Sequence, residues 1–511
     1  MARRIKSRIK ISGKLQAKTA LHFGGNEINA DTDSALAVNG RGDYYLAGTN
    51  LTGLLRAWMT LAINEHITQS DIDRLWGFQS GDLGHASFII VEDGVIKLPV
   101  GLTTEVRDGV GIDRALGTAA DKQKYDREIL PKGSAIELQL TVERCDRKSD
   151  AEWSREKYLL AEVLQAMQNQ ELRIGGGKTR GLGKVQLIDL KIHEQADLLT
   201  PQGILNVLKG DAGSQIKLET LSSLNNLIAK PAQLTITIDW KPLTPVMLKS
   251  EAEGIAVDIL PLVSGNDNGL SLLISGSAIK GVLRSQGEKI VRTVCGYDLP
   301  DNFLTQVQVQ LVKTLFGSAA EIEEGTQQGY QGALAIDDCY ANLSFTPQQW
   351  NKIKTARDSP ELLQALRDAG LTSVQQAFHV AIDRWTGGAA DGALYSVLEP
   401  MGIEWSPVEL TLDLDRLKRD TDDNYLSRIA LLFLVFRDLM NRRIPIGFGT
   451  NRGMGDLEIE KITVKGMRNL AELGDFKTIT FNNDRDLSQR DTEFLQQLTT
   501  AWQTWIEEVA K

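Results

Sequence analysis

A glycine-rich segment with four cations, RIGGGKTRGLGK at residues 173–184, is well suited to bind a ligand. Glycines at this density let the backbone adopt positive φ and come close to a bound group. Exposed backbone amides, with Lys178 and Arg180 among them, suit the oxygens of a phosphate. The segment is not a Walker A loop, because that pattern needs a glycine where the sequence has Leu172. A flexible connection between two elements is the alternative for one such segment taken alone.

The same pattern occurs again near the end of the chain, in IPIGFGTNRGMGDL at residues 444–457. Gly177 and Arg180 correspond to Gly449 and Arg452, and each pair is 272 positions apart (449 minus 177). A plain connecting loop is rarely repeated with its arginine in the same place. The sequence therefore predicts an internal duplication, in which each copy carries its own loop.

Two amphipathic helices are predicted beside these loops, one in each copy. GTNLTGLLR opens the first helix at Gly48 and GSAIKGVLR opens the second at Gly276, with apolar residues along one face. Gly48 and Gly276 are 228 positions apart, as are Arg56 and Arg284. The beginning of a helix presents unpaired amides and the positive end of the helix dipole, so both helices favour a phosphate there.

A third repeated segment, GIDR at 111–114 and AIDR at 381–384, has a spacing of 270 positions. The growth of the spacing from 228 to 270 predicts an insertion in the second copy, largely helical, near 340–376. Strands mixed with few helices favour an α+β fold of the ferredoxin-like, RNA-recognition type. We predict a first domain at 1–193, a linker at 194–232, a second domain at 233–466 and a C-terminal tail with an amphipathic helix at 467–511.

Composition narrows the class of protein. The 511 residues carry a net charge of −10, yet the first acidic residue is Glu27, and seven cations precede it in a strand-like segment. The distribution of charge matters more for nucleic-acid binding than its sum, although lysines that protect a sheet edge explain the same pattern. Three scattered cysteines and five histidines argue against a zinc site or a disulfide framework and indicate a reducing, cytoplasmic setting. The sequence predicts neither a membrane span nor a secretory signal.

Together, the glycine-rich loops, the two helices and the IDR segments, in the same order twice, resemble the RAMP superfamily (repeat-associated mysterious proteins). More narrowly, they are similar to the backbone subunits of type III CRISPR effector complexes. Two such copies in one chain resemble the fused subunits of the type III-D variants. The resemblance implies two ferredoxin-like domains, each with a thumb hairpin that enters between guide and target bases. The thumbs would carry Ile112, Asp113, Arg114, Ile382, Asp383 and Arg384.

The resemblance also implies that each domain binds guide RNA and cleaves complementary RNA with an aspartate and a divalent cation such as Mg²⁺. Comparison of the two copies selects Asp33 and Asp258, 225 positions apart, as catalytic and metal-binding residues, with Asp31 as a second choice. An aspartate that only caps a turn is the alternative. The implied RNA-binding residues are His22, Asn50, Arg56, Gly176, Gly177, Lys178, Arg180, Lys280, Arg284, Gly449, Asn451 and Arg452.

These expectations describe a guide-RNA-binding subunit that cleaves target RNA at two sites, with other type III effector subunits as partners. A purely structural RNA-binding subunit is the main alternative, because it requires the same cations and glycines. An endonuclease that matures the guide precursor usually needs a histidine-centred site, and His22 corresponds to Met247 in the second copy. A phosphate-ligand enzyme unrelated to RNA is disfavoured by the missing Walker spacing.

Overall fold

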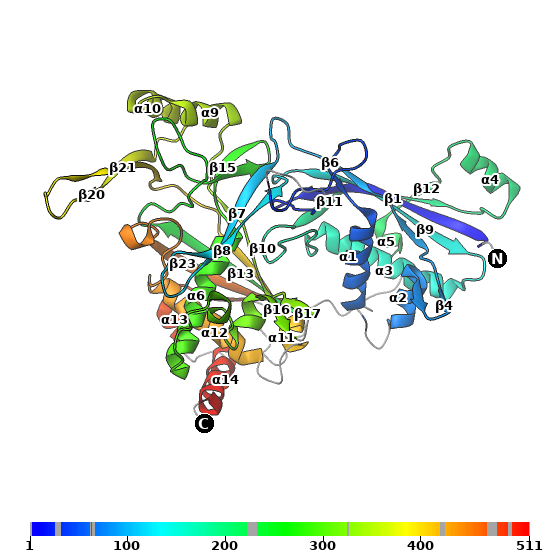
Figure 1. The fold of residues 1–511 in the computed structure, drawn as a ribbon. Coiled ribbons are helices and arrows are strands. Elements are labelled where there is room, and N and C mark those ends of the chain that lie inside the picture. The colour runs from blue at the N-terminus through cyan, green and yellow to red at the C-terminus, as the bar shows by residue number, and fades with distance from the viewer. Residues whose placement is uncertain are drawn as a thin grey trace.

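Two antiparallel sheets with helices packed against them form the body of the molecule (Figure 1). The computed structural model describes residues 3–25, 32–61, 63, 67–221, 232–323, 326–419, 425–467, 478–488 and 493–509. We call the described residues up to 221 the first unit and those from 232 onward the second unit. Each unit has a hydrophobic core of its own.

In the first unit, the first strand lies in the interior of the sheet. β1 (Ile5–Ala17) pairs antiparallel with β11 (Val185–Gln195) on one side and with β9 (Ala135–Cys145) on the other. Apolar side chains of β1 such as Ile9 and Leu15 are fully buried and alternate with polar residues, as expected for a strand with one core-facing side. Because β1 is an interior strand, its lysines do not protect a sheet edge.

The remaining elements complete a ferredoxin-like order. Along the chain the first unit runs β1, α1, β6, β9, α3 and β11, and in space the strands lie in the order β11-β1-β9-β6. The other elements of this unit's sheet and its helices are β2 (Tyr45–Leu46), β5 (Ile89–Val91), β6 (Gly94–Lys97), β12 (Ser214–Ile216), α1 (Gly48–Leu61), α2 (Gln69–Trp76), α3 (Asp150–Gln168), α4 (Pro201–Leu208) and α5 (Leu218–Leu221).

The second unit repeats this topology. β13 (Gln233–Pro242) lies between β22 (Val408–Asp413) and β23 (Leu457–Met467), and β18 (Leu334–Asp337) pairs with β22. The chain order β13, α6, β18, β22, α12 and β23 matches that of the first unit, so both units are ferredoxin-like. The helices of the body are α6 (Gly276–Cys295), α7 (Phe303–Gln306), α8 (Val312–Phe316), α11 (Leu414–Arg419) and α12 (Tyr425–Met440).

The predicted linker and tail both contribute to the folded units. Within the stretch 194–232, β12 pairs with β11, and Leu221 is buried in the first core, so the first unit extends beyond residue 193. In the tail, Trp505 of α14 (Glu493–Val509) is buried in the second core, where α14 packs against α12. The remaining tail elements are β24 (Thr478–Phe481) and α13 (Asp484–Ser488).

The predicted insertion is helical and packed. It forms α9 (Pro347–Thr355) and α10 (Ser359–Asp368), whose apolar side chains join the second core. Short strands outside the two main sheets are β3 (Phe78–Ser80), β4 (Leu83–His85), β14 (Val263–Asn266), β15 (Gly269–Ile274), β16 (Ser318–Glu323), β17 (Thr326–Tyr330) and β19 (Cys339–Tyr340).

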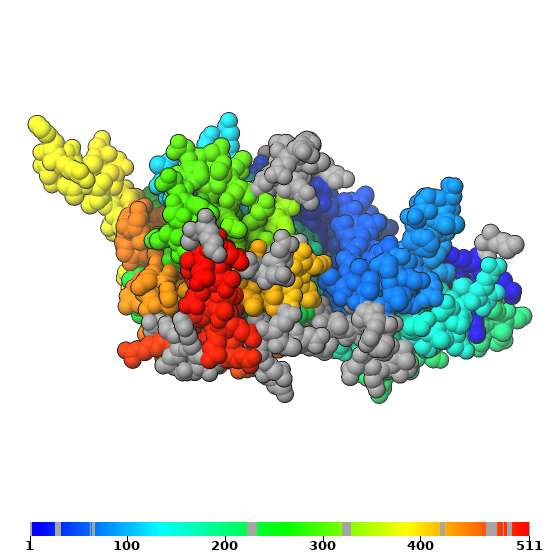
Figure 2. All heavy atoms as spheres, turned by 90° about the horizontal axis from the view of Figure 1, so that it is seen from below, coloured from blue at the N-terminus to red at the C-terminus, as the bar shows by residue number. Residues whose placement is uncertain are grey.

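Each unit also carries one long hairpin, which we call its thumb. The first thumb consists of β7 (Glu105–Ile112) and β8 (Ala119–Ile129), and the second thumb of β20 (Val374–Ile382) and β21 (Ala389–Pro400). The second thumb projects from the body into solvent, as Figures 1 and 2 show in yellow. The first thumb instead bonds to the second unit.

The junction between the units buries charge. Arg107 of the first thumb forms an ion pair with Asp338, whose side chain is fully buried, and donates to Ser264 Oγ at 2.7 Å. β10 (Arg180–Gly181), part of the first glycine-rich loop, pairs parallel with β18 of the second unit. The loop of the first unit therefore extends the sheet of the second.

Candidate RNA-binding interface and carboxylate sites

The two glycine-rich loops have the same backbone. In the first, the amide of Gly176 donates to the carbonyl of His22 at 2.9 Å, and in the second the amide of Phe448 donates to Met247 at 2.7 Å. In both loops, the amide of the arginine donates to a glycine carbonyl three positions earlier at 2.8 Å. These matched bonds confirm the duplication at the level of individual atoms, and they join each loop to the segment that follows the first strand of its unit.

Close approach of the chain to itself accounts for several of these glycines. Gly175 has φ of +76°, and a Cβ there would lie 2.2 Å from the carbonyl oxygen of His22. Gly447 has φ of +101°, and a Cβ there would lie 2.3 Å from the carbonyl oxygen of Met247. No other residue fits without moving the backbone. The glycines are therefore needed for the fold of the loop, and not only for access of a ligand as the sequence suggested.

Each loop arginine bonds to a tyrosine of its own thumb. Arg180 donates to the hydroxyl of Tyr125 at 2.8 Å, and Arg452 donates to the hydroxyl of Tyr395. No motif in the sequence singles out either tyrosine, although they are 270 positions apart, the same spacing as the IDR segments. Loop and thumb are thus connected in the same way in both units, and the arginines, both exposed, lie where a ligand on this face would meet them.

A cavity of about 540 Å³ opens between the glycine-rich loop, α1 and residues 22–24, which follow β1, in the first unit. Its polar lining consists of predicted RNA-binding residues together with Arg127 of β8, which lies in no sequence motif. These residues are His22, Asn50, Arg127, Gly176 and Lys178. The structure therefore brings together in one place residues that lie far apart in the sequence.

His22 holds the wall of this cavity in place. Its Nδ1 lies 2.7 Å from the carbonyl oxygen of Glu128, and its Nε2 lies 3.0 Å from Ser34 Oγ. Burial is the main cause that lowers the pKa of His22. With both ring nitrogens occupied and only 5% of the residue exposed, His22 connects the Asp33 segment to the thumb, and its structural role is evident.

The corresponding region of the second unit carries apolar side chains. By the repeat spacings, His22 corresponds to Met247, Arg127 to Val397, Gly176 to Phe448 and Leu182 to Met454. Met247, Val397 and Met454 form a buried cluster with Phe448 packed against it. The duplicated backbone thus carries a polar cavity in one unit and a hydrophobic cluster in the other.

Two of the predicted RNA-binding cations are already fully engaged in the fold. Lys280 is 5% exposed and donates to the carbonyl of Leu334 at 2.7 Å, and burial holds its pKa well below the usual range. Arg284 bonds to Glu288 and to the carbonyls of Gly317 and Val307, each at 2.7 Å. Lys280 is buried, and each nitrogen of the Arg284 guanidinium already donates a hydrogen bond. In this fold neither side chain is available to a phosphate, contrary to the prediction.

The first amides of the two helices are also occupied. The amide of Gly48 donates to Asp93 Oδ1 at 2.7 Å, and that of Gly276 donates to Asp338 Oδ1 at 2.8 Å. Each aspartate supplies the negative charge that favours a helix N-terminus. The phosphate predicted for these positions would therefore have to compete with a carboxylate of the protein itself.

Three further predicted residues lie at the surface. Asn50 and Asn451 are exposed, whereas Arg56 is partly exposed and pairs with Asp73 of α2 at 2.9 Å. Their RNA contacts stay predictions, as do those of Gly177 and Gly449, both at positive φ in the loops.

The two predicted catalytic aspartates occupy equivalent positions at the base of the thumbs. Asp33 Oδ2 accepts from the amide of Asp126 at 3.0 Å, and Asp258 Oδ2 accepts from the amide of Ser396 at 2.6 Å. In return, Asp126 Oδ1 accepts from the amide of Asp33 at 2.6 Å, and Ser396 Oγ accepts from that of Asp258 at 3.2 Å. Asp126 and Ser396 are 270 positions apart, so both thumbs hold an exposed aspartate by the same pair of backbone bonds.

The side chains around the aspartates differ in charge. In the first unit, Asp33 faces a second carboxylate, that of Asp126. In the second, Ser396 also donates its hydroxyl to Asp258 Oδ2 at 2.9 Å. Mg²⁺ needs few protein ligands, since it is commonly bound through one or two carboxylates together with water and substrate phosphates. Either aspartate fits that mode, although the described residues contain no group of three or more candidate metal ligands. Asp31, the second choice, lies outside the described residues.

The IDR segments form the tips of the two thumbs. Oδ1 of Asp113 accepts from the amides of Ala115 and Leu116, and Oδ1 of Asp383 accepts from those of Trp385 and Thr386. The aspartate of each motif therefore shapes the turn. Ile112 and Ile382 are exposed at these tips.

The arginines of the two tips differ. Arg114 pairs with buried Glu288 of α6 at 2.7 Å, whereas Arg384 is exposed. Contact with the second unit thus holds only the first tip in place.

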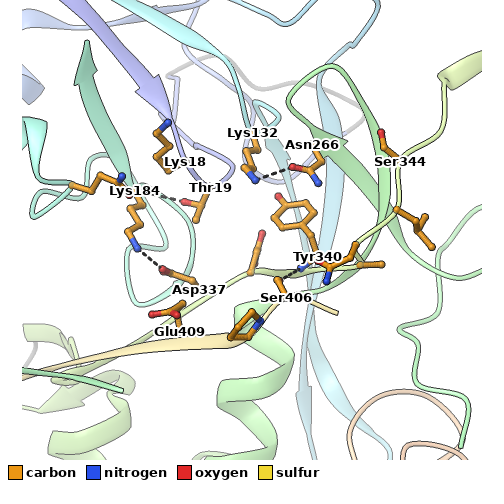
Figure 3. A pocket seen from close by; sticks show the side chains of 16 residues that line it. Lys18, Thr19, Lys132, Lys184, Asn266, Asp337, Tyr340, Ser344, Ser406 and Glu409 are labelled. Atoms are coloured by element: carbon orange, nitrogen blue, oxygen red, sulfur yellow. Dashed lines mark hydrogen bonds and ion pairs between the residues drawn. The ribbon is translucent and has the colours of Figure 1, made fainter. Parts of the chain in front are cut away.

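A second cavity, of about 580 Å³, lies at the junction between the units (Figure 3). Three lysines line it, and three carboxylates in the same lining, those of Asp337, Asp338 and Glu409, balance their charge. Lys184 pairs with Asp337 at 3.1 Å, and Lys132 donates to the neutral side chain of Asn266 at 2.8 Å. Figure 3 shows both contacts as dashed lines that cross from the first unit to the second. This cavity is a polar part of the interface between the two units, and its lining has no excess of positive charge.

Comparison with family models shows a match to the model of the RAMP superfamily at residues 14–186 and 259–458. The two matches fall in different units and together cover most of the chain. No curated protein matches the sequence. None of the helices in the described part of the chain combines the length and the apolar character that crossing a bilayer requires.

Proposed function

Because the chain belongs to the RAMP superfamily, we propose that it is a guide-RNA-binding backbone subunit of a type III CRISPR effector complex that also cleaves bound target RNA. Family membership supports the coarser statement, a CRISPR-associated RNA-binding subunit. One observation supports cleavage: both units present an exposed aspartate at the base of the thumb, held by matched bonds. Two units then imply two cuts.

Guide binding is proposed for the face that carries the loops. Arg180, Arg452 and Lys178 offer cations there without sequence selectivity, as contacts to an RNA backbone require. Base pairing between guide and target would supply the specificity, as in other RNA-guided systems. The protein's net charge of −10 does not oppose this, because the cations are local to the loops.

The proposed cleavage uses a nucleophile that RNA itself supplies. The 2′-oxygen of a target ribose attacks the adjacent phosphorus, the bond from phosphorus to the 5′-oxygen breaks, and a 2′,3′-cyclic phosphate and a 5′-hydroxyl result. Asp33 or Asp258 can accept the proton of the 2′-hydroxyl or orient that group. Much of the rate would come from holding the reacting atoms in line. DNA would be resistant because it lacks the 2′-hydroxyl.

Mg²⁺ or another divalent cation is the proposed cofactor. The carboxylates of Asp33 and Asp258 would hold it, with Asp126 as an additional oxygen donor in the first unit. When bound, it would neutralise charge on the phosphoryl oxygens. The proposed partners are the guide RNA, complementary target RNA and further effector subunits, for which the free second thumb offers a contact surface. The three cysteines, all free, support a reducing cytoplasmic setting.

A scaffold without nuclease activity is the second candidate. The bonds that Asp33 and Asp258 make to the thumbs favour it, because turn-capping and thumb-anchoring alone would explain why both units have an aspartate there.

The decisive experiment uses the assembled guide-loaded complex, end-labelled complementary RNA and Mg²⁺. Wild type is compared with Asp33→Asn, Asp258→Asn and the double variant, with Asp391→Asn of the second thumb as an exposed control. We expect each single change to remove one distinct cut while target binding stays unchanged. Survival of every cut in the double variant would establish the scaffold instead. Failure of target binding in the single variants would assign both aspartates to the fold.

A further inference from the structure

The cavity of the first unit carries positive charge that no carboxylate in the described part of the chain pairs with. Among the described residues, neither Arg127 nor Lys178 has an ion-pair partner, and Arg127 Nε is buried without a hydrogen bond. Burial is the main cause that lowers the pKa of both side chains, and Arg180 adds repulsion at Arg127. Cations that are partly desolvated without a counter-charge favour the entry of an anion.

The remaining lining of the same cavity is largely apolar, and we call it the apolar wall. Leu46, Leu51, Leu54 and Ala57 line it, from β2 and α1, and Phe23 and Ile174 complete it. Asn50 adds a side-chain amide at the rim. A cavity with an apolar wall and few convergent polar groups is the usual form of a small-molecule site, and about 540 Å³ falls within the size range of such sites.

We propose that this cavity binds a phosphate-bearing nucleotide, with the phosphate at Arg127 and Lys178 and the base against the apolar wall, and that the second unit has no such site. The inference deepens the guide-binding proposal and rests on it where the nucleotide belongs to an RNA chain. A free nucleotide has the same chemistry, and the experiment separates the two sources.

The second unit supports the proposal by contrast. Val397 and Thr450 stand where the first unit has Arg127 and Lys178, and Phe448 stands where the first unit has Gly176. A side chain at Gly176 would lie 3.1 Å from the ring of His22, so the absence of a side chain keeps the first cavity open. If the two loops carried the same side chains, both units would bind RNA in the same way. The difference in side chains gives a pocket to the first unit alone.

The test replaces the two cations with the residues of the second unit, in the full-length chain. Wild type, Arg127→Val, Lys178→Thr and the double variant are titrated with adenosine 5′-monophosphate and with a short single-stranded RNA at several salt concentrations. Lys352→Thr, an exposed lysine of α9, is the matched control. Acetylation of Lys178, followed by mass spectrometry with and without each probe, reports directly on occupancy of the cavity.

We expect the double variant to bind RNA about tenfold or more weakly, with a slope of log affinity against log salt reduced by about one for each lost phosphate contact. If RNA protects Lys178 from acetylation and the mononucleotide does not, the site binds a nucleotide within an RNA chain. Protection by the mononucleotide alone assigns it to a free nucleotide and speaks against guide binding.

The inference is wrong if wild type and both single variants bind RNA equally and if Lys178 of the wild type is still acetylated in the presence of either probe. That result would leave guide binding intact. Since Lys178 lies in a loop, Lys178→Thr keeps the test valid even if Arg127→Val does not fold.

Discussion

The first and second units share a backbone topology but differ in the side chains and contacts around it. Their loops make the same hydrogen bonds, their thumbs end in the same aspartate-capped turn, and each thumb holds an aspartate at its base. Yet the first unit has a polar cavity where the second has Met247, Val397 and Met454 packed together. The first thumb is bonded to its neighbour, whereas the second is free.

This contrast separates what the duplicated fold needs from what a ligand needs. Glycines and turn-capping aspartates recur because the backbone cannot be built without them. Arg127 and Lys178 do not recur, so the fold does not require them, and a role in binding explains them better. Substitutions that exploit the contrast are therefore informative.

The largest effect is expected for Arg107→Ala at the junction. Removing this arginine leaves the fully buried carboxylate of Asp338 without its cation, which costs about 3–5 kcal/mol for a buried pair. Hydrogen exchange at the amide of Gly276, which donates to Asp338, should become faster, and the thermal midpoint should fall. Arg41→Ala, at an exposed arginine of the first unit, is the control; equal effects of the two changes would mean that the junction contributes no stability.

Next in size is the effect of Ser396→Ala on target cleavage. The change removes a hydroxyl that donates to Asp258 Oδ2 and accepts from the amide of Asp258, but it leaves the bond from the amide of Ser396 in place. A hydrogen bond to a charged group is worth about 1.5–3 kcal/mol, which corresponds to a rate about tenfold lower, or more. Only the cut assigned to Asp258 should slow in single-turnover assays, and Ser396→Thr should restore it. Slowing of both cuts alike would contradict a local effect.

A smaller difference is expected between the equivalent arginines of the two thumb tips. Arg114→Ala removes an ion pair with buried Glu288, which keeps Arg284 as a partner, so we expect a loss of about 1–2 kcal/mol. Arg384→Ala, at an exposed position, should change stability by less than about 0.5 kcal/mol. Urea unfolding of both variants measures the difference, and the comparison fails if Arg384→Ala costs as much.

The smallest effect concerns pH and belongs to the first thumb alone. Burial, followed by the neighbouring Glu251 of the second unit, raises the pKa of Asp108 from 3.8 to about 6. The folded state then holds a proton that the unfolded state has lost, so stability falls as pH rises from about 4 to 6. Asp108→Asn should flatten the stability profile in that window by a few tenths of a kcal/mol. A profile that is unchanged in the variant would show that Asp108 does not titrate there.

Repeats in the sequence predicted most of the architecture. Spacings of 225, 228, 270 and 272 located both ferredoxin-like units, both thumbs and the aligned positions of Asp33 and Asp258, because duplicated elements keep their order. The same spacings also align Tyr125 with Tyr395 and Asp126 with Ser396, but those residues have no motif around them that would single them out.

The sequence did not predict which polar residues are buried or how the two units contact each other. Lys280 looks like an RNA-binding cation until the chain folds, because its bond to the carbonyl of Leu334 joins residues 54 positions apart. Likewise, nothing local to Arg127 shows that it faces a cavity formed by α1 and the loop. Pairings between distant segments depend on the packing of two units, and periodicity within one segment carries no information about them.

The ion pair of Arg107 and Asp338 also has a consequence for how the chain is made, since its members are 231 positions apart. At a synthesis rate of 5–20 residues per second, the first thumb would leave the ribosome roughly 10–50 s before its partner exists. During that interval its cations and its exposed valines, Val106 and Val110, face solvent. The second thumb remains in that condition after synthesis is complete. The first thumb is therefore exposed to solvent for a limited time during synthesis, whereas the second thumb stays exposed in the folded protein.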